Sequence, residues 1–337
     1  MALVEVTKLG LYCPQADIYI DPWRKVPRAM ITHAHADHAR SGMGLYIAQE
    51  HSVPLLKSRL GKIQAQGYSY GTSFYCNGVR FSFHPAGHVP GSAQIRLEYK
   101  GEVWVVSGDY KLEDDGLSVP FEPIKCHSFI TESTFGMPIY RWMPQEKVFG
   151  ELNDWWATNA EEGVVSVMVG YSLGKAQRIL HHLDASIGPV IVHPAIHEMN
   201  DEIRAFAPQL KQATKWTKGI KPEENRNAMI LIPPGAHEVH WIEKFRPYSM
   251  GFASGWMNLR GARRWNAADR GFVISDHADW PSLLRAIQDT GAEKVFVTHG
   301  YTSVLVRYLR ELGLEAEEFE TLFEGEIQEV HSAAAHE

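Results

Sequence analysis

The sequence predicts an α/β protein, and three observations lead to this fold class. Over roughly the first 130 residues, turn residues separate short apolar runs, which is typical of strands and loops. After Met143-Pro144, segments with helical apolar spacing alternate with apolar runs, which indicates β-α units around a parallel sheet. After about residue 262, the order strand, loop, helix occurs twice more. We therefore expect three segments, at residues 1–145, 146–262 and 263–337.

Four stretches of the first segment predict strands. ADIYIDP alternates apolar and polar residues, and VRFSFHPAG has a similar pattern. AQIRLEYKGEVWVVSGD predicts a hairpin that turns at Lys100-Gly101, and HSFITEST predicts another buried strand. Each stretch ends at a glycine, a proline or a charged residue, where functional side chains can lie.

The middle segment predicts helices and strands in alternation. We expect helices at VFGELNDWWATNA, at SLGKAQRILHHLDAS with Ser172 as N-cap, and at NDEIRAFAPQLKQA. We expect strands at GVVSVMVGY, GPVIVHP, NAMILIPPG and SMGFASG. In the last segment, RGFVISDHADWPSLLRAIQDT and KVFVTHGYTSVLVRYLREL each predict a strand followed by a helix.

Composition narrows the class of protein. A chain of 337 residues with 45% hydrophobic and 22% charged residues predicts one large or two medium globular domains. The net charge of −7 excludes a general attraction to nucleic acid, so phosphate binding would have to be local. Three scattered cysteines exclude a disulfide framework and a thiolate zinc site. The first residues do not resemble a signal peptide, and no apolar run approaches the ~20 residues of a membrane helix, so we expect a cytoplasmic protein without a membrane anchor.

The stretch ITHAHADH carries the clearest chemical signal. It places His33, His35, Asp37 and His38 within six residues, and imidazole nitrogens and carboxylate oxygens are ligands of zinc and related metals. A single histidine at a strand end is more often a hydrogen-bonded loop residue, but that explanation does not suit four such residues together. This stretch therefore predicts a metal site, with room for two adjacent ions.

Three later residues are candidates to complete this site. His88, Asp109 and His299 each follow or end an apolar strand in a glycine-containing loop, and a carboxylate at Asp109 is suited to bridge two metals. Asp21, in YIDPW, either orients a ligand histidine or caps the Asp-Pro turn.

The motifs ITHAHADH, AGHVPGSAQ, SGDY and VTHG resemble the successive metal motifs of the metallo-β-lactamase superfamily. The resemblance implies a four-layer αβ/βα sandwich with two divalent metal ions, zinc or manganese, at one edge. It assigns His33, His35 and His88 to one metal, and Asp37, His38 and His299 to the other. Asp109 would contact both.

Two further motifs resemble the β-CASP nucleases of that superfamily, which carry an inserted α/β domain. TEST contains Glu132, and SDHAD contains His277. YSLGKAQ and FASGWM resemble segments of the insert, here residues 146–262. The resemblance is greatest to the bacterial ligase-associated DNA exonucleases, and it implies that His277 acts as an acid or phosphate ligand oriented by Glu132. Asp37, Asp109, Glu132 and His277 are therefore the expected catalytic residues.

The expected nucleic-acid contacts are local. Lys175 and Arg178 lie early in a predicted helix, and Ser254-Gly255 lies in a loop similar to phosphate-binding loops of β-CASP nucleases. A basic patch follows at Arg260, Arg263 and Arg264. The alternative for these basic residues is an ordinary solvated face.

The expected activity is that of a metal-dependent nuclease. A DNA exonuclease that acts in DNA repair on single-stranded DNA, with a functional link to a DNA ligase, is favoured. An RNA-processing ribonuclease is the alternative, because a histidine at the position of His299 resembles the RNA-processing branch. A small-ester or thioester hydrolase and a non-catalytic scaffold are less consistent with the complete set of motifs.

Overall fold

The chain forms two compact units in the computed structural model, which describes residues 2–235, 241–259 and 268–321. Of the described residues, 2–141 and 277–321 belong to the first unit, and 142–235, 241–259 and 268–276 belong to the second. The second unit continues beyond the expected boundary at residue 262, because the strand β17 (Arg270–Phe272) pairs with its sheet.

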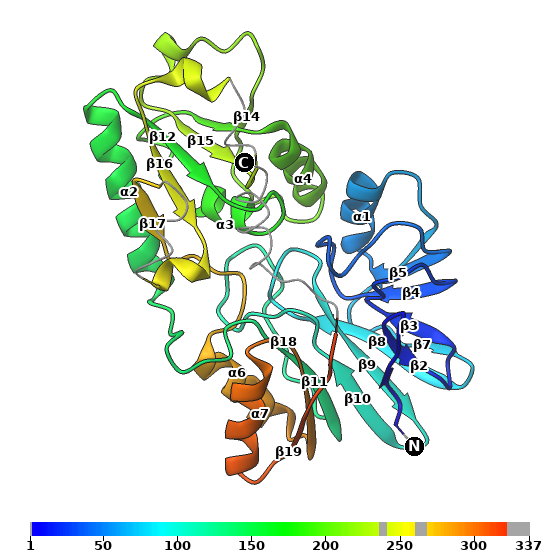
Figure 1. The fold of residues 1–337 in the computed structure, drawn as a ribbon. Helices are drawn as coiled ribbons and strands as arrows, with labels where there is room; N and C mark the ends of the chain where they lie inside the picture. The colour runs from blue at the N-terminus through cyan, green and yellow to red at the C-terminus, as the bar shows by residue number, and fades with distance from the viewer. Residues whose placement is uncertain (1, 236–240, 260–267, 322–337) are drawn as a thin grey trace. The chain divides into compact units, whose positions relative to one another are not determined.

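The first unit contains a sheet of six strands in the order β1-β2-β3-β4-β5-β6 (Figure 1). The strands β1 to β3 pair in antiparallel fashion, and β3 to β6 pair in parallel. The bounds are Glu5–Val6, Leu11–Cys13, Ile18–Ile20, Arg28–Ile31, Leu45–Gln49 and Ala65–Tyr68.

Helix α1 (Ser52–Leu60) lies between β5 and β6 in the chain and was not expected from the sequence. It has nine residues, and its buried residues are Ser52, Leu55 and Leu56. This short apolar face is too small to show a helical period, so the expectation of strands and loops alone was incomplete.

A second sheet of seven strands has the order β19-β18-β11-β10-β9-β8-β7. The predicted hairpin is confirmed, since Tyr99 pairs with Glu102 across the turn between β9 and β10. The strands β10, β11 and β18 run parallel to one another. In chain order, the bounds of β7 to β11, β18 and β19 are Phe74–Cys76, Val79–Pro85, Ala93–Tyr99, Glu102–Val106, Ser128–Ser133, Lys294–Gly300 and Glu315–Glu318.

The seven-stranded sheet buries both of its faces. Trp104 and Val106 of β10 join a core cluster that also contains residues of the six-stranded sheet. Val105, between them, joins a cluster with α6 (Trp280–Thr290) and α7 (Thr302–Glu311), which cover the other face (Figure 1). This alternation follows from the two-residue period of a strand. The unit is therefore a mixed α/β structure.

The second unit confirms the predicted parallel sheet. Its six strands have the order β14-β13-β15-β12-β16-β17, and every pair is parallel. The bounds of β12 to β16 are Val165–Val169, Val190–Val192, Thr214–Lys215, Met229–Ile232 and Tyr248–Ala253. The helices are α2 (Gln145–Glu161), α3 (Lys175–His182) and α4 (Pro194–Arg204), and the short turns are η1 (Pro222–Glu224), η3 (Ile242–Phe245) and η4 (Gly255–Asn258).

Two predicted helix starts in this unit are wrong. Helix α3 begins after Gly174, not Ser172, because the Gln177 side chain accepts a hydrogen bond from the Gly174 amide at 2.7 Å. Helix α4 begins at Pro194 rather than near Asn200, because proline suits the first helical position and the His193 side chain caps the Ala195 amide. Among the described residues, no helix combines the length and the apolar character needed to cross a membrane.

Candidate metal centre

The ends of five strands in the first unit carry the residues of the candidate site. Because β10, β11 and β18 are parallel, their carboxyl ends lie at one edge of the sheet, where they place Asp109, Glu132 and His299. The loop after β4 carries the histidines of ITHAHADH, and the loop after β8 carries His88. The two sheets approach closely here, since a Cβ atom on Gly108 would lie 2.6 Å from Thr32 Cβ.

The first ligand group consists of three histidines and a carboxylate. His35 Nδ1 lies 3.1 Å from both His33 Nε2 and His88 Nε2. Asp109 Oδ2 lies 3.6 Å from His33 Nε2 and 3.8 Å from His88 Nε2. Ligands about 2.0–2.1 Å from a zinc ion lie roughly 3.3 Å from one another in a tetrahedron. The group therefore has the donor atoms and the spacing of a metal site.

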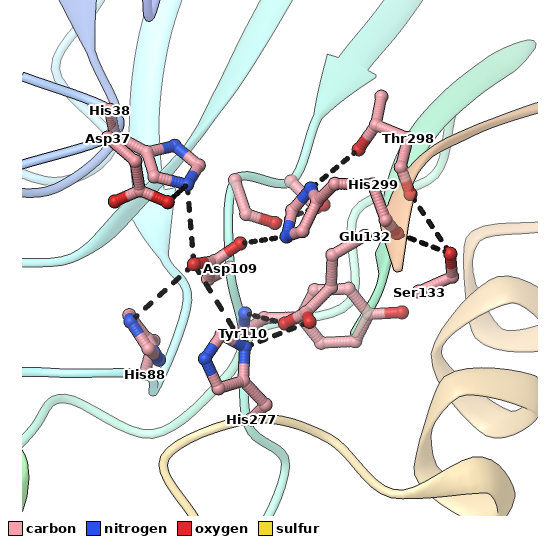
Figure 2. A network of polar contacts seen from close by, with 12 residues as sticks. Asp37, His38, His88, Asp109, Tyr110, Glu132, Ser133, His277, Thr298 and His299 are labelled. Atoms are coloured by element: carbon pink, nitrogen blue, oxygen red, sulfur yellow. Dashed lines mark hydrogen bonds and ion pairs between the residues drawn. The ribbon is translucent and has the colours of Figure 1, made fainter. Parts of the chain in front are cut away.

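The second ligand group shares Asp109 with the first. His38 Nε2 lies 3.3 Å from Asp109 Oδ2 and 3.6 Å from Asp37 Oδ2, and His299 Nε2 lies 3.1 Å from Asp109 Oδ1 (Figure 2). The oxygen Oδ2 of Asp109 thus faces histidines of both groups, as a ligand that bridges two ions would. Each of the two groups has donor atoms that could hold a metal ion, and Asp109 belongs to both.

Asp21 lies behind these ligands. Its Oδ2 is 2.8 Å from His38 Nδ1 and accepts a hydrogen bond from Thr32 Oγ1 at 2.6 Å, while its Oδ1 accepts one from the Thr32 amide at 2.8 Å. A hydrogen bond at Nδ1 leaves Nε2 of His38 to face Asp109. Of the two roles considered for Asp21, its position favours the orientation of a ligand histidine.

His277 and Glu132 lie beside the two groups. His277 Nδ1 is 2.9 Å from Glu132 Oε2 and 4.0 Å from Asp109 Oδ2. The other oxygen of Glu132 accepts a hydrogen bond from the Tyr110 amide at 2.8 Å (Figure 2). Both side chains are buried. The structure therefore brings together all the metal-site and catalytic residues that the sequence analysis named.

The buried charges of the site stabilise one another. Burial opposes the charge on His38, but the carboxylates of Asp109 and Asp37 outweigh it and raise the pKa of His38 well above its ordinary value. Burial also opposes ionisation of Asp109, but His38, His299 and His277 lower the pKa of this carboxyl well below its ordinary value. Asp109 is therefore a carboxylate at neutral pH, which is the form that binds a cation.

His33 has the opposite electrostatic environment from His38. Burial lowers the pKa of His33 well below its ordinary value, and the neighbouring histidines lower it further. A neutral imidazole results, which is the ligand form of histidine. Its Nδ1 lies 3.1 Å from Thr32 Oγ1, so Nε2 faces the first ligand group.

Two of the expected phosphate contacts in the second unit, Lys175 and Arg178, do not lie on a solvated face. Lys175 and Arg178 are buried, and their charged nitrogens lie 3.8 Å and 3.9 Å from Asp276 carboxylate oxygens. Arg178 also donates a hydrogen bond to the Ser275 carbonyl at 2.6 Å. The alternative of an ordinary solvated face therefore does not hold for these two residues, because both are buried and a buried carboxylate offsets their charges. Their contact with phosphate stays a prediction.

The other expected phosphate contacts stay predictions. The Ser254 side chain caps η4 by accepting a hydrogen bond from the Trp256 amide at 3.3 Å, and Gly255 is the buried first residue of that turn. Arg260, Arg263 and Arg264 lie outside the described residues.

Two residues beside the site were not expected from the sequence. Thr32 contacts Asp21 and His33, and Ser133 donates hydrogen bonds to the carbonyls of Thr298 and His299 at 3.0 Å and 2.5 Å. Both are next to named motif residues in the chain. This proximity in the sequence was the one sign that Thr32 and Ser133 could lie at the site. It could not identify their hydrogen-bond partners, which lie up to 166 positions away.

Several known proteins are similar to this chain, although no family model matches it. A protein named probable DNA ligase from Opitutus terrae is 29% identical over 314 residues, which are 91% of this chain and 30% of that protein. Endoribonuclease YSH1 from Yarrowia lipolytica is 32% identical over 121 residues, or 34% of this chain and 14% of that protein. Endoribonuclease ysh1 from Schizosaccharomyces pombe is 28% identical over 200 residues, which are 50% of this chain and 26% of that protein. This chain spans less than a third of each relative.

Solved structures also share the fold of this chain. A protein of unknown function from Enterococcus faecalis superposes with a TM-score of 0.55 at 11% identity, over 80% of this chain and 74% of the other. The sequence comparisons go further than the fold, because they align this chain with an endoribonuclease and with a segment of a probable DNA ligase. They confirm that the chain resembles the β-CASP nucleases of the metallo-β-lactamase superfamily.

Proposed function

We propose that this protein is a two-metal nuclease that hydrolyses phosphodiester bonds. The observation that carries the proposal is the pair of ligand groups joined by Asp109, with the His277–Glu132 pair beside them. We also propose the four-layer metallo-β-lactamase sandwich for the first unit and the inserted β-CASP domain for the second, so that the insert runs from Trp142 to Asp276 instead of over the expected residues 146–262.

Zinc or manganese would be held by His33, His35 and His88 at one position and by Asp37, His38 and His299 at the other, with Asp109 at both. Bound divalent ions lower the pKa of water and polarise a phosphoryl oxygen. The carboxylates Asp37 and Asp109 offset the charge of the ions, and Asp21 fixes the ring of His38.

His277 is the acid or phosphate ligand of the proposed reaction. Its Nδ1 lies 2.9 Å from Glu132 Oε2, and the proposed contact with the substrate is made through the other ring nitrogen, Nε2. From there it would donate a hydrogen bond to a phosphate oxygen or a proton to the leaving oxygen. A small ester or thioester would not require this additional buried pair.

The favoured substrate is single-stranded DNA, cut from an end during DNA repair in the cytoplasm. The alignment of 91% of this chain with a segment of a probable DNA ligase supports this choice and the functional link to a ligase. Phosphate contacts are proposed for Ser254-Gly255 and for the segment with Arg260, Arg263 and Arg264. Lys175 and Arg178 would take part only through their buried cluster with Asp276.

RNA processing is the second candidate function. The alignments with endoribonucleases and the presence of His299 support it. The two candidates share the same metal centre and differ in the nucleic acid that is cut.

One assay tests both candidates. Purified protein is incubated with end-labelled single-stranded DNA or RNA of the same sequence, with zinc or manganese, alongside His277→Ala. We expect stepwise shortening of DNA by the wild-type protein, at least about 10²-fold slower with His277→Ala at equal metal content. Cleavage of RNA alone would favour the second candidate. Undiminished cleavage by His277→Ala would exclude its catalytic role.

A further inference from the structure

Helix α1 contacts both loops that supply the three histidines of the first ligand group, although it contributes no ligand itself. Its last turn touches the loop of ITHAHADH through Arg59, and its first residue, Ser52, touches the loop that follows His88. These loops lie after different strands, β4 and β8, in different sheets of the unit.

Arg59 binds three carbonyl oxygens of the ITHAHADH loop. Its Nε donates to the Ala34 carbonyl at 2.8 Å, and its Nη2 donates to the His35 carbonyl at 3.4 Å and to the Ala39 carbonyl. These carbonyls lie on either side of the turn that bears Asp37 and His38. The planar guanidinium can hold them at once, whereas a lysine ammonium lacks this fork of donors.

Ser52 makes the contact at the other end of the helix. Its Oγ donates a hydrogen bond to the Gly91 carbonyl at 2.7 Å. Gly91 has a φ of +81°, and a Cβ atom there would lie 2.9 Å from the Ser52 amide nitrogen. The loop of His88 can therefore approach the helix this closely only with glycine at this position.

We propose that α1 is a strut that holds the loops of His33, His35 and His88 in the geometry of the metal site, with Arg59 as its main positioning residue. This inference rests on the proposed metal centre, but not on the choice of substrate. A metal ion binds more tightly when its ligands are already arranged, because less conformational freedom is lost on binding.

Electrostatics and positioning predict opposite effects when Arg59 is replaced. A guanidinium close to a cation site repels the cation, so its removal alone would strengthen metal binding. Removal of the three hydrogen bonds would free the loop and weaken metal binding. The sign of the change therefore separates the two explanations.

The test compares Arg59→Met with Lys57→Met, which removes a positive charge from the same helical turn. Lys57 is exposed, and Arg59 is also exposed, so neither substitution opens the hydrophobic core. Metal affinity is measured by titrating apoprotein with zinc against a chromophoric chelator, and thermal unfolding of the apoprotein is recorded in parallel.

We expect Arg59→Met to weaken zinc binding by about 10-fold or more, as is usual when a residue that orients metal ligands is lost. Lys57→Met should bind zinc as the wild type does. Ser52→Ala should also weaken zinc binding. The zinc affinity of Arg59→Lys should lie between those of Arg59→Met and the wild type. These two variants keep the test informative if Arg59→Met does not fold. The apoprotein unfolding midpoint of Lys57→Met should match that of the wild type, whereas Arg59→Met should lower it because three hydrogen bonds are lost.

Unchanged or tighter zinc binding by Arg59→Met would overturn the proposal that α1 holds the ligand loops in place. Wild-type protein that binds no metal would overturn the strut and the metal centre together. Wild-type protein that binds zinc but cuts neither DNA nor RNA would reject only the nuclease, and the comparison of Arg59→Met with Lys57→Met would still decide the role of α1.

Discussion

Asp109 joins the parts of the candidate site through its two carboxylate oxygens. Oδ2 lies within 4 Å of His33, His38 and His88, and Oδ1 lies 3.1 Å from His299 Nε2. Its ionised form is favoured although the side chain is buried, because the surrounding histidines lower its pKa. At the scale of the residue, the site thus depends on two carboxylates. Asp109 faces histidines of both ligand groups, and Glu132 holds His277.

Glu132→Gln tests this second carboxylate. Glu132 accepts one hydrogen bond at each oxygen, from the Tyr110 amide and from His277 Nδ1. Glutamine has one acceptor oxygen, so its amide group would face one of these donors, at a cost of about 1–3 kcal/mol for a buried unsatisfied group. We expect slower cleavage and a lower unfolding temperature.

The measurement combines single-turnover cleavage with thermal unfolding, at metal content verified to equal that of the wild type. Glu122→Gln is the matched control, because Glu122 is a glutamate of the same unit that is close to His84 rather than to the site. Equal rates for Glu132→Gln and Glu122→Gln would exclude a role of Glu132 in orienting His277.

At the scale of the element, strand direction explains how distant residues meet. The parallel strands β10, β11 and β18 end at one edge of the sheet, so Asp109, Glu132 and His299 converge although they are up to 190 positions apart, as their numbers give (299 − 109). Helix α6 begins directly after the loop of His277. Its N-cap is Asp279, whose side chain accepts a hydrogen bond from the Ser282 amide at 3.1 Å.

Asp279→Ala should loosen the start of α6. Loss of an aspartate N-cap typically costs about 1 kcal/mol, which corresponds to roughly fivefold faster hydrogen exchange at the amides it stabilises. We expect this increase in the first turn of α6, measured by hydrogen exchange resolved to single amides.

Asp289→Ala is the control for this prediction, because Asp289 lies on the same helix in an exposed ion pair with Arg285. Exposed pairs of this kind contribute little stability. If Asp289→Ala accelerates exchange in the first turn as much as Asp279→Ala does, the cap is not the cause.

At the scale of the whole molecule, the candidate metal site and the buried basic cluster lie in different units. All the candidate metal ligands, with Glu132 and His277, belong to the first unit, and the buried Lys175–Arg178–Asp276 cluster belongs to the second. A cation that binds the folded first unit stabilises that unit by mass action.

Removal of metal should therefore lower the unfolding temperature of the first unit. At a free metal concentration of 100 times Kd, bound metal stabilises a folded unit by about 2.7 kcal/mol. We expect calorimetry to show an unfolding transition that shifts downward with a chelator and upward again when zinc or manganese is restored.

Two histidine variants provide the controls for this shift. His35→Ala removes a proposed ligand of one metal position and should reduce the shift. His84→Ala removes a histidine that contacts Ser82 and Glu122 instead and should preserve it. A shift of equal size in both variants would mean that the metal acts elsewhere.

The sequence by itself determined the residue types of the site and much of the local structure. Histidine and aspartate at the spacing of ITHAHADH identified the candidate ligands, since ligand chemistry depends on residue type and on short-range spacing. The hairpin at Lys100-Gly101 and the parallel sheet of the second unit were also predictable, because turn residues and β-α alternation are local signals.

The tertiary structure decided which side chains meet. Arg59 reaches a carbonyl 25 positions away, Ser52 one 39 positions away, and Arg178 one 97 positions away. No local pattern records such contacts, so α1 was missed and the burial of Lys175 and Arg178 beside Asp276 was not expected. Local spacing specifies which chemical groups are present, but only the packing of distant segments determines their partners and their burial.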